Sequence, residues 1–161
     1  MKKIALAIGV LLVISVLAFV VVRINPDIAS NIMVNSSPAQ PTVTINSHTY
    51  TIEIADTSES QQQGLSDRTS LPQEHGMLFI FPEKQVRSFW MKDMHFPLDM
   101  IWIDGDTIVD ITENVPPPTP GESPAIVYPK APVDKVLELN AGEVKRIGVS
   151  AGQKVLLSID F

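Results

Sequence analysis

Hydrophobic residues follow two different patterns along this chain. Residues 4–22 form an unbroken uncharged run, whereas beyond residue 41 the apolar positions come in short stretches bounded by Gly, Pro, Asn and Asp. At about 1.5 Å per helical residue, the run reaches roughly 28 Å, close to the roughly 30 Å hydrocarbon core of a bilayer. Lys2 and Lys3 precede the run and Arg23 follows it, which favours an N-terminus inside the cell. We therefore expect residues 1–23 to be a single-pass inner-membrane anchor, with the rest of the chain on the extracytoplasmic side.

A cleaved signal peptide is the alternative interpretation of this segment. Val16-Leu17-Ala18 offers a weak small-residue cleavage site, but the apolar run continues beyond it through Val22. The hydrophobic region of a signal peptide is usually shorter, so the length favours an uncleaved anchor. Residues 24–41 carry three prolines and no sustained period, which predicts a flexible linker.

From residue 42 onward, the pattern indicates strands. Tyr50, Ile52 and Ile54 alternate with Thr51 and Glu53, which is typical of a strand with one buried face. Similar short runs recur to the end of the chain. The predicted strands are 43–45, 50–54, 77–81, 88–91, 98–104, 107–112, 135–139, 144–147 and 154–160.

Turn residues separate these strands and predict their connections. Asn46-Ser47 and Asp104-Gly105-Asp106 suit tight hairpins. One short helix is expected from Ser58 to about Leu65, with Ser58 and Gln61 as a capping box and Gly64 as the stop. Residues 115–124 hold five prolines and predict a stiff exposed loop. The fold expected for residues 42–161 is a single, compact, mainly β domain, an antiparallel barrel or sandwich.

Composition excludes several classes of function. The chain has no cysteine, so disulfides, thiolate metal sites, cysteine nucleophiles and cysteine-linked lipids are excluded. Glycine-rich phosphate motifs, a nucleophile elbow and the HExxH motif are also absent from the sequence. Without Lys2, Lys3 and Arg23, nine basic residues remain against 18 acidic ones, a net charge of −9. Such an acidic domain is a poor candidate for binding nucleic acid.

The chain carries several ordered blocks of sequence. They are Gly64-Leu65 with Arg68 and Leu71-Pro72, then Gly76-Met77-Leu78-Phe79, Phe89-Trp90-Met91-Lys92, Pro97-Leu98-Asp99, Val136-Leu137-Glu138, Gly142 and Gly148. Together these blocks resemble a widespread prokaryotic family catalogued as domain of unknown function 192, and the resemblance covers roughly residues 43–161. It implies a compact, mainly antiparallel β fold with a short helix, often behind an export signal, and it implies no activity. The chain departs from the family pattern at Asp93-Met94, where Asn-Thr is usual.

Four residues in or near these blocks form the predicted ligand-binding site: Arg68, Trp90, Lys92 and Asp99. Trp90 would supply an apolar or sugar-stacking wall, and the three charged residues would supply directed hydrogen bonds. In the structural alternative, Asp99 pairs with Arg68 or Lys92 and satisfies backbone groups of a loop.

Two other chemistries use neighbouring residues. Asp99 with His95 or Glu138 could act as the acid/base pair of a small hydrolase. Met91, Met94 and His95 could hold Cu(I), because thioethers and imidazole suit that ion. Packing of methionines in the core is the simpler explanation of the Met residues.

Since no complete catalytic set or cofactor motif is present, we predict a ligand-binding or accessory module without a resident cofactor or metal. Its partners would be the membrane, through the N-terminal helix, and a small molecule or an envelope protein. A hydrolase centred on Asp99 and a structural envelope protein without ligand are the alternatives.

Overall fold

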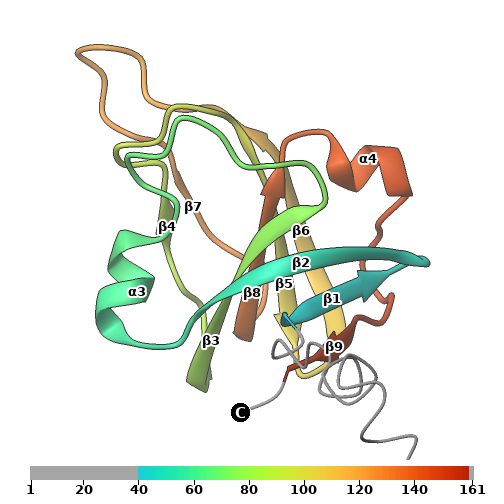
Figure 1. Ribbon diagram of the computed structural model, residues 1–161. Helices are drawn as coiled ribbons and strands as arrows, with labels where there is room; N and C mark the ends of the chain where they lie inside the picture. The colour runs from blue at the N-terminus through green and yellow to red at the C-terminus, as the bar shows by residue number, and fades with distance from the viewer. Residues whose placement is uncertain (1–39, 160–161) are drawn as a thin grey trace, which may run out of the picture. The chain divides into compact units, whose positions relative to one another are not determined.

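Seven strands form one sheet in the order β6-β5-β8-β3-β2-β1-β9, in a computed structural model that describes residues 40–159 (Figure 1). The predicted anchor, residues 1–23, and most of the linker lie outside the described residues. Within the described part, no helix is both long and apolar enough to cross a membrane. The elements are β1 (Thr42–Ile45), β2 (His48–Ala55), α3 (Ser58–Gln63), β3 (His75–Gln85), β4 (Phe89–Trp90), β5 (Leu98–Asp104), β6 (Thr107–Val115), β7 (Ile126–Val127), β8 (Val133–Asn140), α4 (Glu143–Ile147) and β9 (Leu156–Ser158).

The sheet curls into a half-barrel, and its two edges approach each other at one end. Thr107 at the start of β6 forms a β-bridge with Lys154, just before β9. The amide of Val155 donates to the carbonyl of Asp106 at 2.9 Å. The mainly β prediction is therefore confirmed. The prediction of a purely antiparallel sheet is wrong, because β2 and β3 pair in parallel, a pairing that needs the long crossover supplied by residues 56–74.

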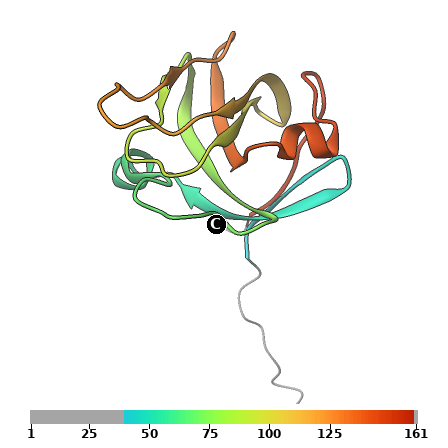
Figure 2. The ribbon, with the colours of Figure 1, turned by 90° about the horizontal axis from the view of Figure 1, so that it is seen from above.

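Both faces of the central strands are buried. Every residue from Leu98 to Ile103 in β5 is buried. Apart from Asp99, these residues are all hydrophobic, as in a strand that is buried on both faces. Leu78, Ile101 and Leu137 belong to the core on one face. The core on the other face, called here the second core, contains Phe79, Met100, Trp102 and Val136 together with residues outside the main sheet. Figure 2 shows α3 and α4 on opposite sides of the sheet.

The predicted strand at 144–147 is wrong, because this segment forms the helix α4. Its buried residues, Val144 and Ile147, lie three positions apart, which suits one face of a helix. Gly142 at the N-cap has no side chain to accept from the first amides. The carboxylate of Asp99 does so instead, accepting from the Val144 amide at 2.9 Å. Distant tertiary contact thus supplies a cap that no neighbouring residue could reveal.

The hairpins and the helix α3 follow the predictions more closely. Asn46 and Ser47 both have positive φ, 48° and 67°, as a two-residue hairpin turn with this twist requires. The helix α3 ends at Gly64 as predicted, but its capping box is Thr57 with Ser60 rather than Ser58 with Gln61. Gln61 instead donates to the carbonyl of Ile80 at 2.7 Å and fixes α3 against β3.

A separate two-stranded ribbon covers the second core. The predicted strand at 88–91 is present as β4, and it pairs antiparallel with β7, which follows the proline-rich segment and was not predicted. Trp90 faces Ile126 across this ribbon. The ribbon, α3 and the central strands enclose the space in which the candidate site lies.

Candidate functional site

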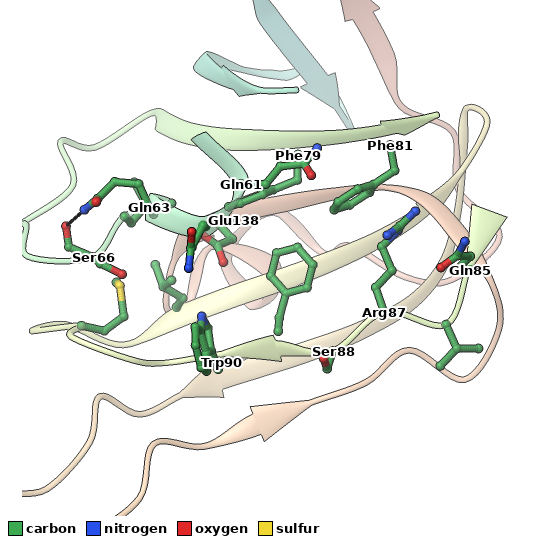
Figure 3. A pocket seen from close by; sticks show the side chains of 17 residues that line it. Gln61, Gln63, Ser66, Phe79, Phe81, Gln85, Arg87, Ser88, Trp90 and Glu138 are labelled. Atoms are coloured by element: carbon green, nitrogen blue, oxygen red, sulfur yellow. Dashed lines mark hydrogen bonds between the residues drawn. The ribbon is translucent and has the colours of Figure 1, made fainter. Parts of the chain in front are cut away.

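A cavity of about 360 Å³ lies between the central strands, α3 and β4 (Figure 3). Amide side chains line it on the α3 side, and aromatic rings line the sheet and ribbon sides. Among the described residues that line it, one acid and one arginine are the only charged ones. A concave site with apolar walls and few convergent polar groups is the usual form of a small-molecule site. The residues used below are Gln61, Gly64, Leu65, Phe79, Phe81, Arg87, Phe89, Trp90, Met94, Leu98 and Glu138.

Glu138 on β8 is the acid of the cavity. Its strand neighbours are Met77 on β3 and Met100 on β5, so thioether side chains flank it on both sides. The residue is 5% exposed, and burial raises the pKa of its carboxyl group to about 8. No charge or hydrogen bond in residues 40–159 opposes this effect, so the surroundings of Glu138 favour the protonated form of its carboxyl group.

Arg87 lies elsewhere in the same cavity. Its guanidinium carbon is 3.9 Å from the centroid of the Phe81 ring, a cation–π arrangement. One terminal nitrogen, Nη2, donates to the carbonyl of Glu83 at 2.9 Å. The Nε atom is buried and has no hydrogen-bond partner within the described residues. Within the described residues, the Arg87 guanidinium therefore makes one hydrogen bond, to a backbone carbonyl, and none to a carboxylate.

Aromatic rings form the wall between these groups. Phe89 on β4 meets Phe79 on β3 edge to face, with centroids 4.9 Å apart, and meets Trp102 on β5 in the same way at 5.4 Å. These contacts hold the ribbon against the sheet. Trp90, next to Phe89, is 49% exposed and lines both this cavity and a neighbouring hollow that also contains Lys92.

Close packing fixes the α3 side of the cavity. Gly64 has a φ of 50°, and a Cβ added there would lie 3.3 Å from the Phe79 ring. Glycine at this position lets α3 end directly against the aromatic wall.

The structure does not bring the four predicted site residues together. Asp99 is fully buried, and its two oxygens accept from the amides of Asn114 at 2.8 Å and Val144 at 2.9 Å. Arg68 forms a two-bond ion pair with Glu53, at 2.5 and 2.8 Å, which lowers the pKa of that carboxyl group. Among the four, only Trp90 lines the cavity.

Within the described residues, Asp99 forms neither of the predicted ion pairs, with Arg68 or with Lys92. The Lys92 ammonium lies near the Asp93 carboxylate and 5.5 Å from the centroid of the Trp90 ring. The structural alternative also expected Asp99 to satisfy backbone groups, and this agrees with the structure. The Asp99 carboxylate accepts from the backbone amides of Asn114 and Val144.

The predicted hydrolase pair is separated by the pleat of the sheet. Met100, not Asp99, is the residue of β5 paired with Glu138. Successive residues of a strand point to opposite faces, so the Asp99 and Glu138 side chains lie on opposite sides of the sheet. His95, the other predicted partner of Asp99, is exposed.

The predicted copper ligands differ in their exposure to solvent. Met91 and Met94 are 0% and 6% exposed within the second core, whereas His95 is exposed. The described residues contain no cluster of three or more His, Cys, Asp or Glu side chains able to hold a metal ion.

The sequence contains one local signal that marks Glu138. Glu138 lies between Leu137 and Leu139 in a strand that also contains Val136. An acid inside a strand that is buried on both faces is unusual, and such groups often mark functional sites. Arg87 and Phe81 had no comparable signal, because their roles depend on how the ribbon folds onto the sheet.

Comparison with known proteins finds a matching family model and similar solved structures. The family model DUF192, described as uncharacterized ACR, matches residues 41–157. A solved structure from Sinorhizobium meliloti, described as a "putative transcription regulator", is 40% identical, with a TM-score of 0.65 over 73% of this chain and 91% of that one. A protein of unknown function from Novosphingobium aromaticivorans is 32% identical, with a TM-score of 0.64 over 76% and 90%. No curated protein matches the chain.

Proposed function

We propose that this chain, which belongs to the DUF192 family of uncharacterised proteins, carries a small-ligand-binding module whose ligand occupies the cavity lined by Glu138. The observation that carries the proposal is the combination of an aromatic-walled cavity with a buried acid that has no partner in the described residues. A carboxyl group that lines a cavity and has no partner in the described residues is available to a ligand that supplies one.

The blocks of sequence that resemble the family supply much of this cavity. Gly64-Leu65, Phe79, Phe89-Trp90, Leu98 and Glu138 come from five separate blocks, and all of them line it. Met94, at a position where the family usually shows Thr, also lines it and makes the wall more apolar in this chain.

Binding is favoured over hydrolysis by the number of acids available. Acid/base hydrolysis of a glycosidic bond commonly uses two carboxyl groups across the substrate, and Glu138 is the one carboxyl group in the lining of the cavity. Asp99, the centre of the alternative hydrolase, has both oxygens occupied by backbone amides. A hydrolase centred on Asp99 therefore has no support from its surroundings.

A nucleic-acid partner is not part of the proposal. The S. meliloti relative is described as a transcription regulator, but this chain has nine basic and 18 acidic residues after residue 23. Binding to DNA depends on neutralising its phosphates with Lys and Arg. We propose instead that the uncharged run at residues 4–22 holds the domain at the extracytoplasmic face of the inner membrane.

A thermal-shift screen tests the binding function. The full-length chain, held in lipid nanodiscs because of its apolar N-terminal run, would be screened against small polar, apolar and charged compounds. A ligand at about a hundred times its dissociation constant stabilises by about 2.7 kcal/mol and raises the melting temperature by several degrees. The stabilisation should be lost in Phe89→Ala or Trp90→Ala and kept in Arg68→Ala, which removes an exposed ion pair outside the cavity. Stabilisation that survives both cavity changes would place the ligand elsewhere.

A further inference from the structure

Resting on the proposed ligand-binding function, we propose that the ligand is a small zwitterion with separated charges. Its ammonium group lies at Glu138, its carboxylate lies at Arg87, and its apolar body lies against the aromatic wall between them (Figure 3).

The ammonium end is argued from the surroundings of Glu138. The side chain points into the cavity, and the groups beside it in the sheet are the apolar Met77 and Met100. Within residues 40–159 it has no hydrogen-bond or charged partner. A cation delivered by the ligand would stabilise the ionised carboxylate, which the protein alone does not. Phe79 and Phe89 offer π faces and edges nearby, and aromatic faces favour cations over anions.

The carboxylate end is argued from Arg87. Its buried Nε donor has no partner in the described residues, and its one recorded hydrogen bond there goes to a backbone carbonyl. Among residues 40–159, no acidic side chain forms an ion pair with it. A planar guanidinium binds a carboxylate through parallel hydrogen bonds, and a ligand carboxylate would bind the terminal Nη groups, of which only Nη2 has a hydrogen bond within the described residues.

The two charges are separate, which sets the shape of the ligand. Arg87 does not contribute to the pKa of Glu138, whose shift comes from burial alone, and no ion pair joins the two residues. Figure 3 shows them entering the cavity at different places. A linear ω-amino carboxylate matches this arrangement better than an α-amino acid, whose two charged groups are adjacent.

The test is isothermal titration calorimetry with the full-length chain in zwitterionic nanodiscs. The ligands are linear ω-amino carboxylates from glycine to 8-aminooctanoate, and the alkylamine, alkyl carboxylate and neutral alcohol that match the best of them in length. One chain length should bind at least about tenfold more tightly than its matched amine or carboxylate. Glu138→Gln should remove the advantage given by the amine, and Arg87→Gln the advantage given by the carboxylate. Arg68→Gln, which changes an arginine paired outside the cavity, should leave all affinities unchanged.

Three other results would overturn the inference. In the first, the matched amine, carboxylate or alcohol binds as tightly as the best zwitterion, and Phe89→Ala weakens that binding. The cavity then binds ligands, but the assignment of a zwitterionic ligand is wrong. If the zwitterion preference persists in a folded Arg87→Gln or Glu138→Gln variant, the assignment of its ends is wrong. If nothing in the series and nothing in the broader screen binds, the proposed function fails together with this inference.

Discussion

The carboxylate of Asp99 on β5 accepts a hydrogen bond from the backbone amide of Val144, at 2.9 Å, and caps the first turn of α4 from a neighbouring strand. Its other oxygen accepts from the amide of Asn114 at 2.8 Å. One buried side chain therefore joins β5, the end of β6 and α4. This arrangement makes Asp99 a structural residue, although the sequence suggested a ligand contact.

Asp99→Ala should destabilise the domain strongly. The change leaves the buried Val144 amide and the partly buried Asn114 amide without their acceptor, and it removes the side-chain cap of α4 seen within the described residues. Loss of the cap leaves the buried Val144 amide unsatisfied, which costs roughly 1–3 kcal/mol, and the lost hydrogen bond at Asn114 costs about 1 kcal/mol. We expect a total loss of about 2–4 kcal/mol in the free energy of unfolding, measured by urea denaturation.

Glu122→Ala is the matched control for Asp99, because it removes the same charge from an exposed position in the proline-rich segment. It should change stability by less than about 0.5 kcal/mol. An Asp99→Ala protein of nearly normal stability that fails to bind a ligand would restore Asp99 as a site residue.

Glu138→Gln should change the pH dependence of stability. The folded pKa of about 8 lies above the ordinary value of 4.5, so the folded state binds more protons between these values, and Glu138 makes the protein less stable as pH rises through that window. Each pKa unit is about 1.4 kcal/mol. The variant should match the wild type near pH 4 and become progressively more stable than it up to about pH 8.

Urea titrations of both proteins at several pH values measure this effect. The difference between the two curves cancels the titration of groups such as Glu53 and Glu143, whose pKa values are lowered by their arginine partners. A difference that stays constant from pH 4 to pH 9 would mean that Glu138 is ionised and satisfied in the folded protein.

Local rules predicted the parts of the fold that local chemistry determines. The turn at Asn46-Ser47 was predictable because those two residues tolerate the positive φ that the hairpin requires. The end of α3 at Gly64 was predictable for a similar reason. The strand prediction at 144–147 failed because four residues are too few to separate the two periods, and the cap of the helix there comes from Asp99, which is distant in sequence.

The candidate site was harder to predict than the fold. Asp99 and Glu138 both appear in sequence as acids within apolar strands, and only the register of β5 against β8 shows which face each occupies. Trp90 was predicted as a wall residue and does line the cavity. Arg87 lies in the connection between β3 and β4, with its guanidinium over the Phe81 ring and bonded to the Glu83 carbonyl, and no hydrophobic pattern predicts the path of that connection.

Gly76→Ala should disrupt the pairing of β3 with β8. A Cβ at this position would lie 2.8 Å from the carbonyl oxygen of Glu138 and 2.7 Å from a methyl group of Leu139. Overpacking of this kind costs roughly 1–3 kcal/mol. Gly121→Ala is the contrasting control, because no atom lies within 4 Å of its added Cβ and its cost comes only from a φ of 88°. Equal chemical-denaturation midpoints for wild type and Gly76→Ala would contradict the tight approach of the two strands.

The two tryptophans should respond in opposite ways to removal. Trp102 is fully buried and donates from Nε1 to the Thr112 hydroxyl at 2.9 Å, so Trp102→Ala should cost about 3–5 kcal/mol of stability. Trp90 is half exposed at the edge of the cavity, so Trp90→Ala should cost less than about 1 kcal/mol while weakening any ligand held there. Circular dichroism during urea denaturation measures both variants without depending on tryptophan emission. A large stability loss in Trp90→Ala would make that ring part of the core, and its exposure at the cavity would then say little about ligands.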